Sequence, residues 1–471
     1  MKYVRVAVFV SILIISLWGL NRVMFSEGRY FDGYEENYVQ TKEGFDELPA
    51  DSLDVIFLGS SNIFLDFSPL DLYADFGYKG YDLATPMQTL QQSYFVLKEA
   101  LESQSPKYVF LDCLSFVGYY DNGEAYTHMV YDTYPLDKFK VEYMEETLPE
   151  TYDKRTFKFP FLLYHTRYDE LNISDFDLSY YEEKEDFLGY SPAFSVKAYE
   201  EKVIEGDLDN IQIWPKDVES LEKIITLCNE NGCKLVLVKT PSNIWYKEAS
   251  EKMKEVALKY GLEFWDFSEL DSINKETDYC DGGGHLNDSG VKKLTYEVGK
   301  KIQNEFGTEW ISSIETTDQY FSDRLNNLQK CRKIQGLIYE YSYSEIVARL
   351  KDEDYVILLN GVESEWANQC INEIAGISNS VINTEKISIF IDNSEDTRTC
   401  CKNEELMIEK YGHTFFLTFN ENKSTIQMDY YNYSSEKEGG VYIAVYDKYY
   451  DCIIDIITIG CIDNELVIRH L

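Results

Sequence analysis

Short apolar runs alternate with amphipathic stretches between residues 52 and 306. The apolar runs are typical of strands buried on both faces of a sheet, and the stretches between them repeat apolar residues with a helical period. This alternation implies right-handed βαβ units, and therefore a three-layer α/β/α fold with a mostly parallel sheet. The expected strands are DVIFLGS, YKGYDLA, KYVFLDC, KLVLVKTP and LEFWDF, and the helical stretches include TLQQSYFVLKEALES, VESLEKIITLCNENG, KEASEKMKEVALKYG and SGVKKLTYEVGKKIQNEF, for which Ser289 is a candidate cap.

The pattern is interrupted by an insert over residues 117–217, which is rich in Tyr, Asp and Glu. Long insertions near the carboxyl edge of such a sheet often form lids or substrate walls. We therefore expect this insert to cover a site at that edge.

Beyond residue 306 the pattern changes again. A polar stretch over 307–335 predicts a helical linker, and residues 336–471 are richer in strand-like segments. We expect a separate α+β domain there. Its predicted strands are DYVILLN, KISIFID, HTFFLTF, STIQMDYYNY, GVYIAVYD and DCIIDIITIG.

The first 25 residues carry Lys2 and Arg5, followed by an apolar stretch over 6–20. A positive flank before such a stretch directs insertion with the amino terminus in the cytoplasm. We therefore expect a signal anchor over 1–25 and a polar tether over 26–51, with the rest of the chain outside the cell membrane. A cleaved signal peptide is the competing interpretation, but no small-residue cleavage site follows the apolar stretch directly.

The amino-acid composition indicates which kinds of partner the protein is poorly suited to bind. The chain has 471 residues and a net charge of −39, which repels nucleic-acid phosphates and argues against a nucleic-acid partner. The acidic residues are spread along the chain, as expected of a solvated surface. The 39 Tyr residues suit stacking on sugars, interfaces or core packing.

The ten cysteines show no CxxC pair and no Cys/His spacing of a metal site. We therefore expect no metal and no cofactor. Cys228 and Cys233 flank a predicted helix end and could form a disulfide, although nothing in the sequence requires it.

Two motifs carry candidate chemistry. GSSN (residues 59–62) follows an apolar strand, and DGGGHLN (residues 281–287) follows the last expected strand of the sheet. A serine nucleophile needs an imidazole to take its proton and a carboxylate to orient that imidazole. His285 and Asp281 supply both groups from one loop. Because strand ends of a parallel sheet share one edge, we expect the two motifs to meet there.

Residues 52–306 resemble the SGNH (GDSL-like) hydrolase superfamily through GSSN, YDLATPMQ, YHTRYDEL and DGGGHLN. Within it they look most like the membrane-anchored branch that includes the D-alanyl-lipoteichoic-acid transfer protein and the alginate O-acetylation proteins. The resemblance implies that Ser61 is the nucleophile and His285 the general base, with Asp281 as the orienting acid. It also implies oxyanion donors at the amide of Ser61 and near Ala84 or Thr85. Candidate substrate contacts in the same motifs are Asn62, Gln88, His165 and Arg167.

The chain departs from the family pattern in three places. Asp281 precedes His285 by four positions where the family has DxxH, so Asp278 is a second candidate for the acid. The third strand ends in Asp112-Cys113-Leu114, with no clear counterpart of the family's asparagine donor. The family's second-block glycine is replaced by Ala84 or Thr85.

Residues 336–471 resemble, more weakly, the interleukin-like epithelial-mesenchymal transition inducer (PANDER-type) domain. The segments that carry this resemblance are DYVILLNGVESEWANQCINEIAG and GGVYIAVYDKYYDCIIDI. The resemblance implies a recognition module without catalytic residues.

These features predict an extracytoplasmic serine O-acyltransferase or esterase, anchored by one membrane span and acting on acyl, most simply acetyl, esters of a cell-envelope polysaccharide. The resemblance adds a polytopic acyl-donating membrane protein as a partner. A non-catalytic glycan-binding scaffold of the same fold is the alternative from another class. A secreted lipase-like enzyme is a third hypothesis, which the predicted anchor disfavours.

Overall fold

The computed structural model describes residues 2–24, 37–114, 116, 123–159, 161–164, 168, 187–201, 213–243, 247–307, 315–361, 365–375, 386–393, 396–401, 404–420, 423–433, 440–462 and 465–470. The chain forms two compact units, Met1–Gln329 and Lys330–Leu471. Each unit has hydrophobic core clusters of its own. The finer division of the chain expected from its sequence stays a prediction.

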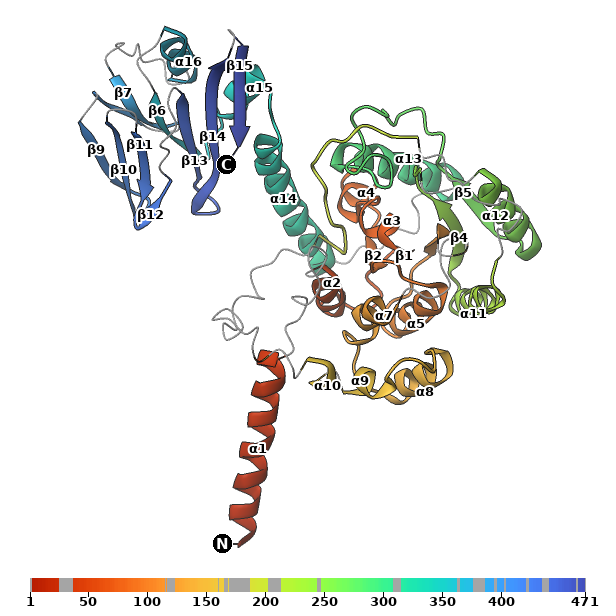
Figure 1. The fold of residues 1–471 in the computed structure, drawn as a ribbon. Coiled ribbons are helices and arrows are strands. Elements are labelled where there is room, and N and C mark those ends of the chain that lie inside the picture. The colour runs from red at the N-terminus through yellow and green to blue at the C-terminus, as the bar shows by residue number, and fades with distance from the viewer. Residues whose placement is uncertain are drawn as a thin grey trace. The chain divides into compact units, whose positions relative to one another are not determined.

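The amino-terminal apolar stretch forms helix α1 (Lys2–Met24) (Figure 1). Many of its apolar side chains are exposed, including Phe9 and Ile15, each at 65%. Within the described part of the chain, no helix is both long and apolar enough to cross a bilayer. The expected helix is therefore present, but the structure lends no support to its transmembrane role, which stays a prediction.

The first unit is built on the expected parallel sheet, with strand order β2-β1-β3-β4-β5. The three strands β1, β2 and β3 are buried along their whole length, as expected of a parallel sheet that helices cover on both faces. Gly59 at the end of β1 pairs with Ala84 at the end of β2, so both strands finish level at the carboxyl edge. The strands are β1 (Val55–Gly59), β2 (Gly80–Ala84), β3 (Tyr108–Asp112), β4 (Lys234–Lys239) and β5 (Glu263–Asp266).

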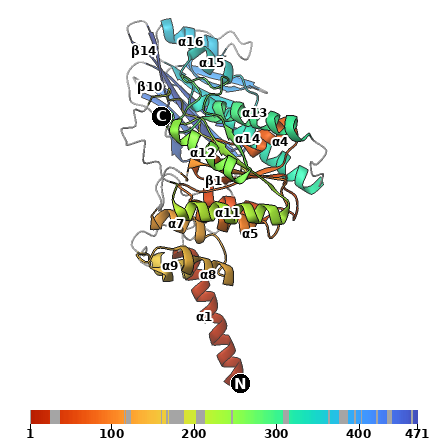
Figure 2. The same cartoon turned by 90° about the vertical axis from the view of Figure 1, so that its right-hand side faces the viewer.

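Helices cover both faces of this sheet, which confirms the three-layer α/β/α arrangement. Helices α4, α12 and α13 lie on one side of the strands and α5 and α11 on the other, as Figures 1 and 2 show. Their bounds are α4 (Pro69–Phe76), α5 (Leu90–Ala100), α11 (Pro215–Asn231), α12 (Lys247–Tyr260) and α13 (Asp288–Phe306).

Two helix boundaries show how local sequence sets the elements. Thr89 and Gln92 form a reciprocal capping box at the start of α5. Helix α13 is capped by Asn287, whose side chain accepts a hydrogen bond from Gly290 N at 3.2 Å. The expected cap, Ser289, lies inside the helix instead. This correction matters for the site, because Asn287 ends the DGGGHLN motif.

A helix occupies part of the stretch expected to be a tether. Helix α2 (Asn37–Asp46) lies there, and Phe45 and Leu48 belong to the core of the first unit. The hydroxyl of Tyr81 in β2 also donates to Thr41 O at 2.8 Å. Spacings of four and three residues among 41, 45 and 48 place one face of this segment against the sheet domain.

The insert is described in part, and its expected role as a lid stays a prediction. Its described helices are α7 (Glu124–Tyr131), α8 (Lys138–Thr147), α9 (Lys154–Lys158) and α10 (Phe161–Tyr164). Helices α7 and α8 lie beside α5, where Tyr143 OH donates to Gln91 O at 2.8 Å and Gln92 Nε2 donates to Thr127 Oγ1 at 3.2 Å. Apolar and aromatic side chains of these two helices are therefore buried against α5.

The second unit contains two antiparallel sheets, with strand orders β15-β14-β13-β6-β7-β8 and β12-β11-β10-β9. This confirms an α+β domain after the parallel sheet. Strands of the larger sheet are β6 (Tyr355–Gly361), β7 (Lys386–Asp392), β8 (Asp396–Cys401), β13 (Val441–Asp447), β14 (Cys452–Ile462) and β15 (Glu465–His470). Those of the smaller sheet are β9 (Glu405–Lys410), β10 (His413–Asn420), β11 (Lys423–Met428) and β12 (Tyr431–Asn432).

The central strand β6 divides the second unit into two cores. Ile357 and Leu359 pack in a cluster with residues of α15 (Tyr343–Arg349) and α16 (Glu365–Ala375). Val356 and Leu358 point to the other face and pack in a cluster with residues of the four-stranded sheet. This alternation explains why the strand is a continuous apolar run. Helix α14 (Glu315–Ile338) spans most of the expected helical linker.

Candidate active site

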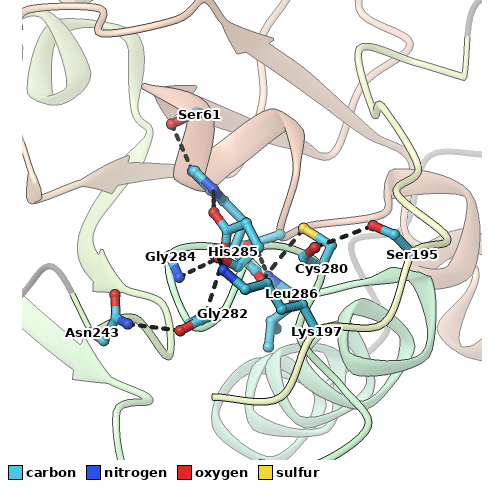
Figure 3. Close-up of polar contacts among 12 residues, drawn as sticks. Ser61, Ser195, Lys197, Asn243, Cys280, Gly282, Gly284, His285 and Leu286 are labelled. Carbon is cyan, nitrogen blue, oxygen red and sulfur yellow. Dashed lines mark hydrogen bonds and ion pairs between the residues drawn. The ribbon is translucent and has the colours of Figure 1, made fainter. Parts of the chain in front are cut away.

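Ser60 and Ser61 follow β1 directly, and the structure distinguishes them. Ser60 is 1% exposed, and its hydroxyl donates to Asp112 Oδ2 at 2.5 Å. Ser61 is the first residue of the short helix α3 (Ser61–Phe64), and its hydroxyl faces the histidine loop (Figure 3). The Ser60 hydroxyl therefore has a structural role, whereas the Ser61 hydroxyl is placed to act as a nucleophile.

The turn before Ser61 requires glycine. Gly59 has φ +153°, and a Cβ atom added there would lie 2.4 Å from Asp112 Cβ. The close approach of β1 and β3 at this edge therefore excludes any larger residue. The glycine of the GSSN motif brings the serine turn against the end of β3.

Ser61, His285 and Asp281 form one continuous chain of hydrogen bonds. His285 Nε2 lies 2.9 Å from Ser61 Oγ, and His285 Nδ1 lies 2.8 Å from Asp281 Oδ2 (Figure 3). Nδ1–H donating to the carboxylate leaves Nε2 as the acceptor for the serine proton. Both distances fall within the range for a nucleophile, its base and the orienting acid. This geometry can activate a serine hydroxyl.

Asp281 reaches His285 because its other oxygen organises the glycines between them. Oδ1 accepts backbone N–H groups from Gly283 at 3.2 Å, Gly284 at 2.7 Å and His285 at 3.0 Å. The extra glycine relative to DxxH is thus absorbed in a tight turn around the carboxylate. The Asp281 carboxylate therefore both holds the backbone of the loop and contacts the His285 imidazole.

The electrostatics of the site lower the pKa of Asp281 and raise the pKa of His285. Burial alone would raise the pKa of Asp281, but the hydrogen bond with His285 and the backbone donors hold it well below its usual value. Burial likewise disfavours the imidazolium, but the hydrogen bond to Asp281 and the charges of Asp66, Asp281 and Asp112 outweigh it, so the pKa of His285 is raised. His285 therefore holds a proton more strongly than a free histidine does.

Asp278, the second candidate for the acid, has other partners. It is 1% exposed, its Oδ2 accepts from Asn274 N at 2.7 Å, and Lys293 Nζ lies 2.5 Å from the same oxygen. These contacts tie the start of the loop to helix α13. The acid facing His285 in the structure is Asp281.

The expected oxyanion donors lie at the same edge of the sheet. Ala84 pairs with Gly59, which places Ala84 and Thr85 level with the serine turn. As the first residue of a helix, Ser61 has a backbone N–H with no acceptor within that helix. The donor role of these amides stays a prediction.

Asp112 occupies the position where the family pattern led us to look for an asparagine donor. Its two oxygens accept from Ser60 Oγ and from Leu114 N, the latter at 3.0 Å. Burial raises the pKa of Asp112, while these hydrogen bonds lower it. In this conformation both oxygens of Asp112 accept hydrogen bonds, so Asp112 holds the serine turn and does not supply the family's side-chain donor.

Two expected substrate contacts are buried in the structure. Gln88 is fully buried, and its Nε2 donates to Ser93 Oγ at 3.0 Å while its Oε1 accepts from Thr85 Oγ1 at 3.1 Å. Asn62 is 1% exposed. Both side chains are therefore inaccessible to a substrate in this conformation, and that of Gln88 forms hydrogen bonds within the fold. His165 and Arg167 lie outside the described residues.

Residues 187–201, the end of the insert, form a strap at the site, and sequence reasoning did not identify its individual contacts. It touches both halves of the site, since Ser191 N donates to Phe64 O at 2.7 Å and Asp288 N donates to Ala193 O at 2.7 Å. Lys197 N also donates to Tyr279 O at 2.9 Å. No periodic pattern marks this extended segment, so its sequence carries no signal of these contacts.

Asn243, just after β4, is a further residue that sequence reasoning missed. Its Nδ2 donates to Glu200 O at 2.8 Å and to Gly282 O at 2.9 Å, and its backbone N donates to Gly283 O at 2.7 Å (Figure 3). Asn243 thus joins the strap to the histidine loop. A polar residue just beyond the carboxyl end of a parallel strand was the available signal.

Among the residues that the structure describes, no group of three or more His, Cys, Asp or Glu side chains could hold a metal ion. The described histidines outside the site pair with nearby carboxylates instead. His128 contacts Asp132, His413 contacts Asp429, and His470 contacts Asp455.

Comparison with known proteins yields distant structural neighbours only. No family model and no curated protein matches the chain. A protein assigned to the G-D-S-L lipolytic family from Desulfitobacterium hafniense DCB-2 is 10% identical, with 52% of this chain and 97% of that chain covered and a TM-score of 0.27. A GDSL-like lipase from Bacteroides thetaiotaomicron VPI-5482 is 11% identical, with coverages of 57% and 99% and a TM-score of 0.29. Scores this low carry no argument about function.

Proposed function

We propose that the protein is a serine-dependent esterase or O-acyltransferase. The observation that carries this proposal is the chain from Ser61 Oγ through both ring nitrogens of His285 to Asp281, with distances of 2.9 and 2.8 Å. A histidine with a purely structural role does not require both a serine hydroxyl at one ring nitrogen and a carboxylate at the other. Acyl transfer needs that order of groups.

The reaction divides into acylation and deacylation. Ser61 Oγ attacks the ester carbonyl while His285 Nε2 takes the serine proton, and His285 then returns that proton to the departing alkoxide. The acyl group remains on Ser61 as an ester. Either water or a sugar hydroxyl attacks it next, with His285 as base, and Ser61 is regenerated. The attacking group decides between an esterase and a transferase.

The cell envelope is the proposed place of action and an acylated polysaccharide the proposed substrate. Support comes from the sequence resemblance to membrane-anchored envelope-modification proteins, and from the exposed apolar side chains of α1, which suit a lipid environment. In this setting a polytopic membrane protein would deliver the acyl group to Ser61. The second unit would recognise the glycan.

Burst kinetics with p-nitrophenyl acetate tests the proposal. The full chain in detergent should release about one p-nitrophenolate per chain in a rapid first phase, because acylation precedes slower deacylation. Ser61→Ala should abolish the burst and lower the steady rate by at least ~10³-fold. Ser103→Ala is a matched control, since its exposed hydroxyl bonds only to Ala100 O nearby. Equal rates for Ser61→Ala and the wild type would refute the enzyme.

One observation favours a second candidate, a non-catalytic glycan-binding scaffold. Asp112, an acceptor, stands where we looked for a side-chain oxyanion donor, so the site depends on backbone amides to stabilise a tetrahedral oxyanion. A chain that binds acylated polysaccharide but shows no burst would favour the scaffold.

A further inference from the structure

A buried carboxylate outside the proposed triad lies between its two halves. Asp66 is 0% exposed and comes five positions after Ser61, just beyond helix α3. Its backbone N donates to Ile63 O at 3.2 Å, which ties it to the end of that helix. Asp66 therefore lies in the same short segment of the chain as Ser61.

The same carboxylate binds the histidine loop. Asp66 Oδ1 accepts the backbone N–H of Leu286 at 2.9 Å, and Leu286 directly follows His285. Leu286 is itself fully buried and bridges to Tyr279 across the loop. This hydrogen bond joins segments 220 positions apart, one residue from the proposed base.

The second oxygen of Asp66 has no hydrogen bond within the described structure, although the hydroxyl of Thr240 is its neighbour. A buried charge without full hydrogen bonding is costly unless an opposite charge compensates it. The cation available to it is protonated His285, which attracts the Asp66 charge.

We propose that Asp66 is a positioning residue for His285, which fixes the histidine loop against the nucleophile helix and adds a second negative charge to that of Asp281 near the imidazole. Its catalytic meaning rests on the proposed function, whereas the positioning of the loop does not.

The electrostatic surroundings agree with this assignment. Burial raises the pKa of Asp66 to about 7, against the lowering influence of His285, Leu286 N–H and Thr240. Further titratable groups among the described residues that interact with Asp66 include Asp281, Tyr279 and Cys280.

His285 faces carboxylates from three elements: Asp281 on its own loop, Asp66 after α3 and Asp112 at the end of β3. Ionised Asp66 raises the pKa of His285, so removing its charge makes His285 lose its proton at lower pH. Because the two groups interact, their titrations are linked.

Histidine NMR tests the proposal directly on the full chain in detergent. The chain has five histidines, so ring carbons can be labelled and His285 assigned by its loss in His285→Gln. Asp66→Asn keeps an oxygen for Leu286 N but removes the charge, and should lower the titration midpoint of His285 by roughly 0.5 to 1 pH unit. Asp217→Asn removes another buried acid, in helix α11 on the other side of the sheet from the histidine loop, and should leave that midpoint unchanged. The same His285 midpoint in Asp66→Asn and wild type, or an equal shift in Asp217→Asn, would overturn the proposal.

A measurement on the wild type keeps the proposal testable if Asp66→Asn does not fold. With ¹⁵N-leucine labelling and assignment through Leu286→Ile, the Leu286 amide proton should shift as its acceptor Asp66 titrates at pH about 7. An amide that does not respond to pH between about 5 and 9 contradicts the hydrogen bond to a titrating carboxylate.

The outcomes separate this proposal from the proposed function. A chain with the His285 shift but no p-nitrophenol burst retains the positioning role and refutes the esterase. A chain with the burst but an unchanged His285 midpoint in Asp66→Asn supports the esterase and refutes the positioning role of Asp66.

Discussion

Each glycine between Asp281 and His285 is needed for its own reason. Gly282 and Gly283 have φ of +91° and +118°, conformations that other residues rarely adopt. A Cβ atom on Gly283 would also lie 2.5 Å from Asn243 Nδ2, and one on Gly284 would lie 2.6 Å from Asp281 Oδ2. These contacts and hydrogen bonds define one conformation of the loop.

Gly284→Ala should therefore damage the triad while sparing the fold. The added methyl group pushes the Asp281 carboxylate away from His285 Nδ1, and we expect kcat to fall by roughly 10 to 100-fold. Gly460→Ala is the matched control, since its Cβ would meet only Val467 O at 3.9 Å. Burst kinetics and thermal unfolding of both variants measure the two effects. Unchanged kcat in Gly284→Ala would show that this orientation of Asp281 is unimportant.

The pH dependence of turnover should report His285. Because only neutral His285 can take the serine proton and its pKa is raised above 6.5, kcat/KM should rise with pH through a midpoint above that value. The fall occurs on the acid side, since protonation removes the base. Measuring kcat/KM of p-nitrophenyl ester hydrolysis from about pH 5 to pH 9 checks this expectation. A midpoint below the ordinary histidine value would contradict the raised pKa.

At the scale of elements, the strap and the end of β4 hold the histidine loop in place. Glu200 N donates to Gly282 O at 2.9 Å, and Asn243 Nδ2 donates to both Glu200 O and Gly282 O. One amide thus bridges three segments that are remote in sequence. The strap and Asn243 therefore hold the histidine loop in its conformation together with Asp281.

Asn243→Asp should uncouple these segments with little change in shape. The carboxylate keeps the size of the amide but cannot donate to either carbonyl, and it places a charge against two carbonyl oxygens. We expect the free energy of unfolding to fall by about 2 kcal/mol, together with a lower kcat. Chemical denaturation and burst kinetics measure both quantities. Stability and kcat equal to those of the wild type would show that the bridge is dispensable.

The sequence predicts elements best where one local pattern decides them. Strands β1 and β3 are buried apolar runs and were expected, whereas β8, β9 and β15 were missed. Strand β9 has one fully buried residue, Ile408, so its strand conformation depends on pairing with β10. The triad could be expected because its two motifs follow strands of one sheet and contain the residue types that a serine nucleophile needs. The contacts of Asp66 and Asn243 could not, because they depend on the path of the histidine loop and the strap, which no local pattern determines.

At the scale of the whole molecule, the chain divides into units with separate cores. The first contains the parallel sheet and the candidate site, and the second contains the two antiparallel sheets. Helix α14 (Glu315–Ile338) runs through the boundary between them. Independent cores predict that damage to one unit leaves the other folded.

Phe390→Ala tests this independence. Phe390 is 1% exposed in the core between the two antiparallel sheets, and its loss should destabilise the second unit by about 3 to 5 kcal/mol. Calorimetry of the full chain should show two unfolding transitions, only one of which moves to lower temperature. Burst kinetics below that transition should be unchanged. A single transition that shifts as a whole would show that the units unfold together.

The order of the chain also sets when the site comes into being. Ser61 and His285 are 224 positions apart, so a ribosome translates most of the first unit before the imidazole exists. Until then Ser61 has no base beside it. On the proposed function, a nascent chain or a proteolytic fragment that stops short of residue 285 therefore does not react with esters.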